Sequence, residues 1–205
     1  MIRDFEPLLH PVRIDDLRPT QMTVGLREVA RKRHAWRDRV DRDGPDYLGR
    51  HMLPAVVGPK GRMWIIDNHH LARALHDEGV EDVLVRVVAD LSHVRERLFT
   101  TFLDNRNWLH PYDADGHRQP SKGIPKHIAK LKDDPYRSLA GELRRAGGYA
   151  KSEVPFTEFL WADYLRHQIP AKKLEEDFEG AVEKALKLAR KPPCGYLPGW
   201  AGPHD

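Results

Sequence analysis

The sequence has almost no cysteine and no long hydrophobic run. Cys194 is the single cysteine among 205 residues, which excludes an intramolecular disulfide and a zinc site built from several cysteines. No segment approaches the roughly 18 consecutive apolar residues that a membrane span requires, and the N-terminal residues lack the apolar core of a signal peptide. We therefore expect a cytoplasmic protein with no membrane partner.

The sequence also lacks a strong excess of charge of one sign. Lysine and arginine together number 34 and aspartate and glutamate 31, which gives a formal net charge of +3. So small a charge produces no strong field that would indicate nucleic acid or an acidic membrane as the partner. A hydrophobic content of 40% can nevertheless bury a real core, either in one domain with a large extension or in two small domains.

The first quarter of the sequence predicts a strand, a helix and a loop. Residues 12–18 fit a short strand. Residues 25–40 place apolar side chains loosely at helical spacing with basic residues between them, which indicates an amphipathic helix. Residues 42–52 contain glycine and proline close together and predict a loop.

The next residues predict a hairpin, a helix and a further strand. The apolar runs LPAVVG and RMWIID are separated by the turn signal GPKG, so they indicate two paired strands. The helix predicted after them ends at Gly79, because glycine tolerates the left-handed conformation of a helix C-terminus. Residues 80–90 are rich in valine and predict a strand. The predicted order is strand, helix, two strands, helix, strand.

After residue 91 the pattern becomes mainly helical. Residues 92–108 predict a helix, and the prolines and glycines that follow predict a long loop. Further helices are expected at residues 125–134, 135–148, 154–169 and 171–191. We therefore predict an α+β protein, with a mixed N-terminal domain at 1–105, a linker or long loop at 106–124 and an all-helical C-terminal region at 125–205.

Polar residues stand where a predicted apolar strand turns into a predicted helix. Residues 67–70 read Asp-Asn-His-His. The first turn of a helix exposes unpaired N–H groups, and these groups together with the helix dipole attract anions such as phosphate. Arg73 follows His69 by one turn, so the two side chains can face a common ligand. The same residues also fit an ordinary helix start in which Asp67 or Asn68 is the N-cap and the histidines are solvated.

Together with the residues before it, this junction resembles the ParB-like nuclease-domain family, which shares its fold with sulfiredoxin and with a group of free-serine kinases. Members carry a segment rich in proline and glutamine before the first helix, then a hairpin and a strand-to-helix phosphate motif. Here the segment is residues 19–21, Pro-Thr-Gln, and the motif is residues 67–70, with Arg73 and Ala74 matching a later Arg-Ala. The resemblance covers about the first half of the chain and implies a small mixed sheet with helices.

Two residues depart from the motif of the family. Asn68 stands where the family has glycine, although asparagine tolerates a positive φ better than most residues. Leu71 stands where many members carry an arginine. The site therefore has fewer cations than the family pattern, which weakens the expectation of tight triphosphate binding.

The resemblance implies a nucleotide site at the junction, with ATP or CTP as the ligand and Mg²⁺ beside Asp67. The residues expected to bind the nucleotide are Thr20, Gln21, Asn68, His69, His70, Leu71 and Arg73. Glu28 resembles the catalytic glutamate of the serine kinases, and the expected catalytic residues are Glu28, Asp67, His69 and His70. An ordinary helix-surface pair of Glu28 with Lys32 is the alternative. The expected reaction is phosphate hydrolysis or phosphoryl transfer, as in an ATPase, a kinase or a nuclease.

A DNA-binding chromosome or plasmid partition module without catalysis is the alternative function. Basic residues gather between residues 122 and 151, and residues 125–146 are compatible with a helix-turn-helix reader of DNA. An HNH-type nuclease that would use Asn105, Asn107 and His110 with the paired histidines fits less well, because a helix and not a hairpin is predicted after them. A homo-oligomer and a scaffold with an inactive pocket remain compatible with the sequence.

Overall fold

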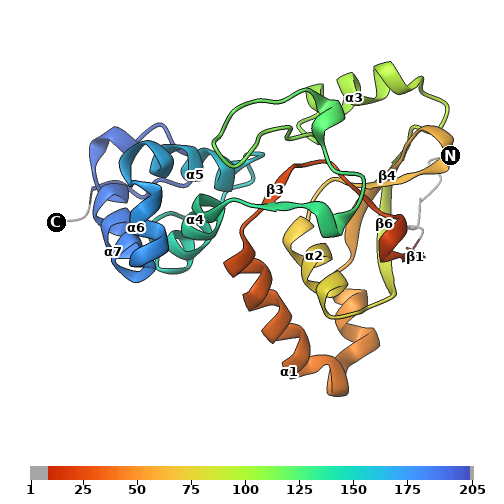
Figure 1. Cartoon of the computed structure of the whole chain (residues 1–205), viewed down its shortest axis with the longest axis horizontal. Helices are drawn as coiled ribbons and strands as arrows, with labels where there is room; N and C mark the ends of the chain where they lie inside the picture. The colour runs from red at the N-terminus through yellow and green to blue at the C-terminus, as the bar shows by residue number, and fades with distance from the viewer. Residues whose placement is uncertain (1–8, 204–205) are drawn as a thin grey trace, which may run out of the picture. The chain divides into compact units, whose positions relative to one another are not determined.

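The computed structural model describes residues 9–203, which form two compact units (Figure 1). Residues 9–24 and 29–132 belong to the first unit, and residues 25–28 and 133–203 belong to the second. The chain therefore leaves the first unit after residue 24, returns at residue 29, and leaves it again after residue 132.

The first unit is built on a five-stranded mixed sheet with the strand order β1-β6-β4-β5-β2. Its strands are β1 (Leu9–Arg13), β2 (Arg18–Pro19), β4 (Leu53–Val57), β5 (Met63–Ile65) and β6 (Asp82–Asp90). The pairs β1–β6 and β4–β5 are antiparallel, whereas β4–β6 and β2–β5 are parallel. The hairpin predicted from the turn signal GPKG is confirmed, as is the strand predicted at residues 80–90.

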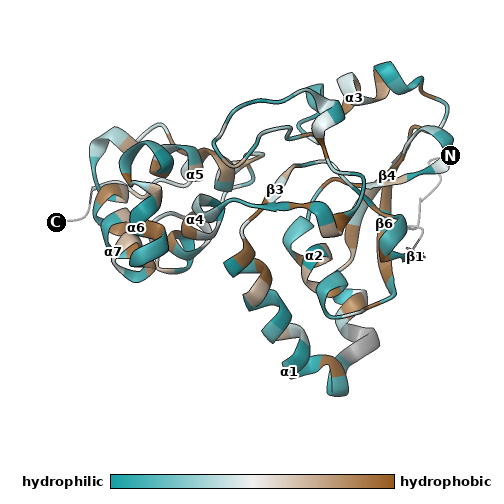
Figure 2. Cartoon of the chain, in the orientation of Figure 1, coloured by the Kyte–Doolittle hydropathy of each residue, from teal (hydrophilic) through white to brown (hydrophobic). Residues whose placement is uncertain are grey.

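Three helices stand between or after the strands of the sheet in the chain order, namely α1 (Leu26–Arg50), α2 (His69–Asp77) and α3 (Glu96–Asn105). Figure 2 shows that β4 and β6 are largely hydrophobic, whereas much of α1 and α2 is hydrophilic. Leu53, Ile65 and Leu75 are fully buried in the core that these elements share. Gly79 follows α2 with φ of 74°, so the predicted glycine at the helix end is confirmed.

The predicted loop at residues 42–52 is wrong for most of its length, because α1 continues to Arg50. Aromatic packing holds the added segment. Trp36 and Tyr47 are both buried and meet edge to face, with ring centroids 5.3 Å apart. His51 stacks on Tyr47 at 4.1 Å. Burial of these rings outweighs the poor helix propensity of the glycine and proline in the segment.

The segment predicted as a linker or long loop, residues 106–124, is irregular and packs within the first unit. Leu109 and Ile124 are buried with Phe99 and Leu103 of α3. The backbone N–H of His110 also donates to the carbonyl of Thr20 at 2.8 Å. The two compact units divide after residue 132, and the irregular segment belongs to the first of them because its apolar side chains are buried there.

The second unit is all-helical, with α4 (Pro135–Arg145), α5 (Thr157–Gln168), α6 (Ala171–Glu176) and α7 (Phe178–Ala189). Its core surrounds Trp161, which is fully buried, stacks on Tyr149 at 4.5 Å and donates its indole N–H to the carbonyl of Pro198. One expected helix at residues 171–191 is divided at Asp177, whose carboxylate caps α7 by accepting from the N–H of Gly180 at 2.9 Å.

The helix predicted at residues 125–134 does not form. This segment contains only a short 3₁₀ turn, Ile128–Lys130, and the strand β7, Lys132–Asp133. Tertiary contacts take its backbone groups instead, because the carbonyl of Leu131 accepts from Arg73 and the N–H of Lys132 donates to the carbonyl of Met22.

The predicted α+β class is confirmed, with a mixed sheet first and helices in the C-terminal part. Within residues 9–203 no helix combines the length and the apolar character that crossing a bilayer would need.

The ion pairs at the end of α2 predict a pH-dependent stability. Arg37 and Arg33 of α1 donate to the carboxylate of Glu78 at 2.6 and 2.5 Å. These hydrogen bonds, chiefly that from Arg37, lower the pKa of Glu78 from 4.5 to about 2. A lowered pKa in the folded state gives stability that is present above the unfolded pKa and is lost as the pH falls toward the folded one.

We therefore expect the stability of the wild-type protein to fall between about pH 5 and pH 2, and Glu78→Gln to show less of this dependence. Denaturant unfolding at a series of pH values measures both. Glu81→Gln, at an exposed carboxylate, is the control and should behave like the wild type. Equal slopes for Glu78→Gln and the wild type would contradict the assignment.

Candidate functional site

The junction between β5 and α2 turns through a left-handed residue. Asn68 is the N-cap of α2 and has φ of 61° and ψ of 27°. This is the region that glycine enters most easily and that asparagine tolerates, so the departure from the family motif keeps the backbone turn. The side chain of Asn68 makes no capping hydrogen bond. Its Nδ2 donates instead to the carbonyl of Met52 at 3.3 Å.

Asp67 lies exposed at this turn, and its Oδ1 accepts from the N–H of Asn68 at 2.7 Å. Among the described residues, the group of three potential metal ligands that lie close together is Asp113, Asp115 and His117, and it does not include Asp67. Asp113 already accepts from the backbone N–H groups of the other two and therefore holds a turn. Asp67 can supply one carboxylate ligand, which suits a Mg²⁺ ion held mainly by phosphate oxygens and water.

His69 joins the two segments that carry the resemblance. Its side chain is buried, and Nε2 accepts from the backbone N–H of Thr20 at 3.0 Å. The hydroxyl of Thr20 donates to the carbonyl of Ile65 at 2.9 Å, at the end of β5. The Nε2 atom must be unprotonated to accept the N–H of Thr20, so this contact requires the tautomer with hydrogen on Nδ1.

Gln21 lies next to this contact and is 5% exposed. Within the described part of the chain, its Nε2 has no hydrogen-bond partner. A buried donor without a partner costs about 1–3 kcal/mol, so such an atom marks a place that a ligand can complete. The sequence singled out Gln21 through the resemblance alone, and nothing in the pattern of residues indicated that its amide would be buried.

His110 is a neighbour of this site that the sequence did not place there. It forms a parallel β-bridge with Gln21, is buried, and packs against Tyr112 with ring centroids 4.5 Å apart. From the sequence, His110 was a candidate only for the site of an HNH-type nuclease. A histidine within an irregular, proline-rich segment carries no periodic signal, and only the tertiary fold brings it to Gln21.

The helix residues after Asn68 are mostly buried. His70 is 9% exposed and Leu71 is 2% exposed. Arg73 donates from Nε to the carboxylate of Asp77 and from Nη1 to the carbonyl of Leu131, both at 2.9 Å. Asp77 ends α2, so this ion pair directs Arg73 along the helix away from its N-terminus. This direction does not favour a contact between Arg73 and phosphate, which stays a prediction. In the structure Arg73 fastens α2 to residue 131.

Glu28 belongs to the second unit, whereas the other predicted site residues belong to the first. Its side chain is buried, and Oε2 accepts from Nη1 of Arg145 at 2.5 Å. Arg145 therefore occupies an oxygen through which this carboxylate would take up a proton. The predicted role of Glu28 as a base is thus an expectation that its surroundings do not favour.

Known proteins that resemble this chain support its fold and identify its family. A family model described as "Putative ParB-like nuclease" matches residues 10–167, which reaches beyond the first half of the chain and through most of α5. A crystal structure of protein Atu1540 from Agrobacterium tumefaciens is similar with a TM-score of 0.92 and 50% sequence identity, over 98% of this chain and 100% of that chain. A search of curated proteins finds no match. The chain belongs to the ParB-like nuclease family that this model describes.

Proposed function

We propose that this ParB-like protein binds a nucleoside triphosphate, ATP or CTP, where β5 meets α2 and hydrolyses a phosphate bond there. The observation that supports the proposal most is the hydrogen bond between Thr20 and His69, beside which Gln21 presents a buried amide without a partner in the described residues. Two segments far apart in the sequence thus meet at a helix N-terminus, and the amide N–H groups of Gln21 beside it can donate to a ligand.

The residues of the site have distinct roles in this proposal. The N-terminus of α2 attracts the phosphates through its dipole, and the side chain of Asn68 does not occupy it as a cap. Gln21 donates to the nucleotide, and His70 lies in the first turn, where it can hold a phosphate. His69 is a positioning residue, since its Nε2 holds Thr20. A Mg²⁺ ion bound with the nucleotide at Asp67 would neutralise phosphate charge.

The alternative of a DNA-binding partition module has less support. The first helix of the expected helix-turn-helix is absent from residues 125–134. Arg144 pairs with Glu158 at 2.9 Å, and Arg145 pairs with Glu28 and Glu142. These paired arginines contribute little net charge for DNA phosphates.

Gln21→Met tests the proposal, because it removes the unpaired amide and keeps a side chain of similar size. We expect the affinity for ATP or CTP with Mg²⁺ to fall about tenfold or more, since one hydrogen bond to a charged group is worth about 1.5–3 kcal/mol. The free energy of unfolding should stay the same or rise. Calorimetric titration and chemical denaturation measure the two quantities.

Gln168→Met, at an exposed glutamine of the second unit, is the matched control and should change neither quantity. Release of phosphate from the bound nucleotide, measured on the wild type and on His70→Ala, tests hydrolysis. Wild-type affinity in Gln21→Met would contradict the site. Binding of DNA with a steep salt dependence and no turnover would favour the partition module instead.

A further inference from the structure

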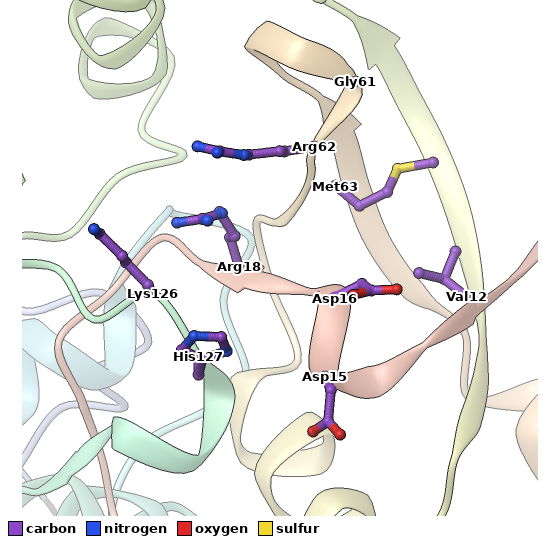
Figure 3. Close-up of a pocket in the computed structure, with 9 residues that line it drawn as sticks. All are labelled: Val12, Asp15, Asp16, Arg18, Gly61, Arg62, Met63, Lys126 and His127. Carbon is purple, nitrogen blue, oxygen red and sulfur yellow. The ribbon is translucent and has the colours of Figure 1, made fainter.

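The first unit contains a polar pocket that lies outside the proposed nucleotide site. Its volume is about 400 Å³ (Figure 3). The lining residues are Val12, Asp15, Asp16, Arg18, Gly61, Arg62, Met63, Lys126 and His127. None of these residues belongs to the β5–α2 junction. The volume lies in the range of roughly 300–1,000 Å³ that small-ligand pockets occupy.

Basic side chains from three separate segments gather on one side of this pocket. Arg18 comes from β2, Arg62 from the turn before β5, and Lys126 and His127 from the segment before residues 128–130. Figure 3 shows the guanidinium groups of Arg18 and Arg62 extending in the same direction, with Lys126 and His127 on the same side. Segments this far apart in sequence bring their cations together only through the fold.

These cations are not neutralised by neighbouring carboxylates. Among residues 9–203, Arg18, Arg62 and Lys126 form no ion pair within 4 Å; the salt bridges of the first unit involve other arginines and His76. Burial and then the charge of Arg62 lower the pKa of Arg18, while the charge of Glu96 acts in the opposite direction. The two arginines therefore repel each other, and an anion between them would relieve that repulsion.

The two acidic residues of the pocket do not cancel its basic side. Oδ1 of Asp15 lies 3.4 Å from Nε2 of His76, so the carboxylate of Asp15 faces α2. In Figure 3 the carboxylate of Asp16 points toward Val12 and away from Arg62. Both residues line the pocket, but their carboxylates point away from the basic side chains, which are open to a ligand.

We propose that this basic pocket binds a phosphate group, with Arg18 and Arg62 as bidentate donors and Lys126 as a further cation. The planar guanidinium group matches two oxygens of a phosphate, whereas the ammonium group adds charge without fixed geometry. Arg18 is held for this role by the ring of Trp64, over which its guanidinium lies at 5.6 Å. The proposal does not depend on the nucleotide site.

The test compares Arg62→Glu and Lys126→Glu with the control Arg86→Glu, which also reverses an exposed charge but lies on β6 outside the pocket. Binding of inorganic phosphate is followed by phosphorus NMR, and binding of a labelled single-stranded DNA by fluorescence anisotropy. We expect at least about tenfold weaker binding of one of these probes in both pocket variants, as for the loss of a charge-assisted contact, and little change in Arg86→Glu.

The two probes separate the sources of the phosphate. Weakened phosphate binding alone identifies a small phosphorylated ligand, and weakened DNA binding identifies the phosphodiester of a strand. Gln168→Met, at an exposed residue outside this pocket and outside the proposed nucleotide site, should leave the binding of both probes unchanged. The proposal is overturned if the wild type binds neither probe, or if Arg86→Glu weakens binding as much as the pocket variants do.

Discussion

Replacing Arg166 with alanine is expected to lower the free energy of unfolding of the second unit by about 3–5 kcal/mol, which is the usual cost of leaving one member of a buried ion pair alone. Nη2 of Arg166 donates to Oδ2 of Asp134 at 2.7 Å, and the two side chains are 13% and 3% exposed. The other oxygen of Asp134 caps α4 by accepting from the N–H of Tyr136 at 3.0 Å. The variant therefore leaves a buried carboxylate with one partner fewer.

The pH dependence of this loss has a definite sign. Burial raises the pKa of Asp134, although the charges of Arg166 and Arg137 act to lower it. Removal of Arg166 raises this pKa further, so Asp134 takes up a proton at a higher pH in the variant. A carboxyl group with a raised folded pKa is stabilised relative to the unfolded state as the pH falls. The difference between variant and wild type should therefore shrink in mild acid.

Chemical denaturation at neutral pH and at about pH 5 measures both effects. Arg190→Ala, at an exposed arginine after α7, is the matched control and should cost little. The double variant Asp134→Asn with Arg166→Met should lose less than the sum of the single changes, because the asparagine keeps the cap without a charge. A small loss in Arg166→Ala at neutral pH would show that the pair is not buried as described.

Replacing His69 with alanine is expected to affect both stability and the proposed hydrolysis. The N–H of Thr20, at a residue that is 2% exposed, would lose its acceptor, which costs about 1–3 kcal/mol. If Thr20 and Gln21 then shift, the proposed nucleotide hydrolysis should fall by about a hundredfold, as when an aligned donor is removed from a catalytic site. Denaturation and phosphate release measure these changes separately.

His69→Gln provides the comparison, because a glutamine oxygen can accept from the N–H of Thr20. A positioning role predicts that this variant recovers stability and hydrolysis together, with more effect on kcat than on KM in His69→Ala. Recovery of stability without hydrolysis would instead mean that the imidazole itself acts on the nucleotide. Full hydrolysis in His69→Ala would contradict both roles.

The sequence predicted the elements whose pattern is local. The hairpin of β4 and β5, the helix α2 with its terminal glycine, and the strand β6 follow from turn signals and apolar periodicity. The errors concern segments whose conformation depends on distant partners. Residues 125–134 carry a helical pattern, yet contacts with Met22 and Arg73 hold them in another conformation.

The candidate site was predictable only in part. The resemblance identified Thr20, Gln21 and His69, but the hydrogen bond between Thr20 and His69 spans 49 positions and has no periodic signal. The burial of Gln21 and the approach of His110 depend on the packed segment around Leu109, which the sequence predicted as a linker or long loop. For Arg73, the helical spacing placed it near His69 but could not reveal that Asp77, at the same spacing on the other side, would bind it.

The first residues of α1 complete the second unit from a distance of more than a hundred positions. The N–H of Leu26 donates to the carboxylate of Asp133 at 2.8 Å, and the guanidinium of Arg27 lies 4.0 Å from the centre of the Phe178 ring. A methyl group on Gly25 would meet the backbone of Ser138 at 2.6 Å. A fragment that starts at Asp133 would lack residues 25–28. Gene fusion or domain exchange could therefore not transfer the second unit as one uninterrupted segment.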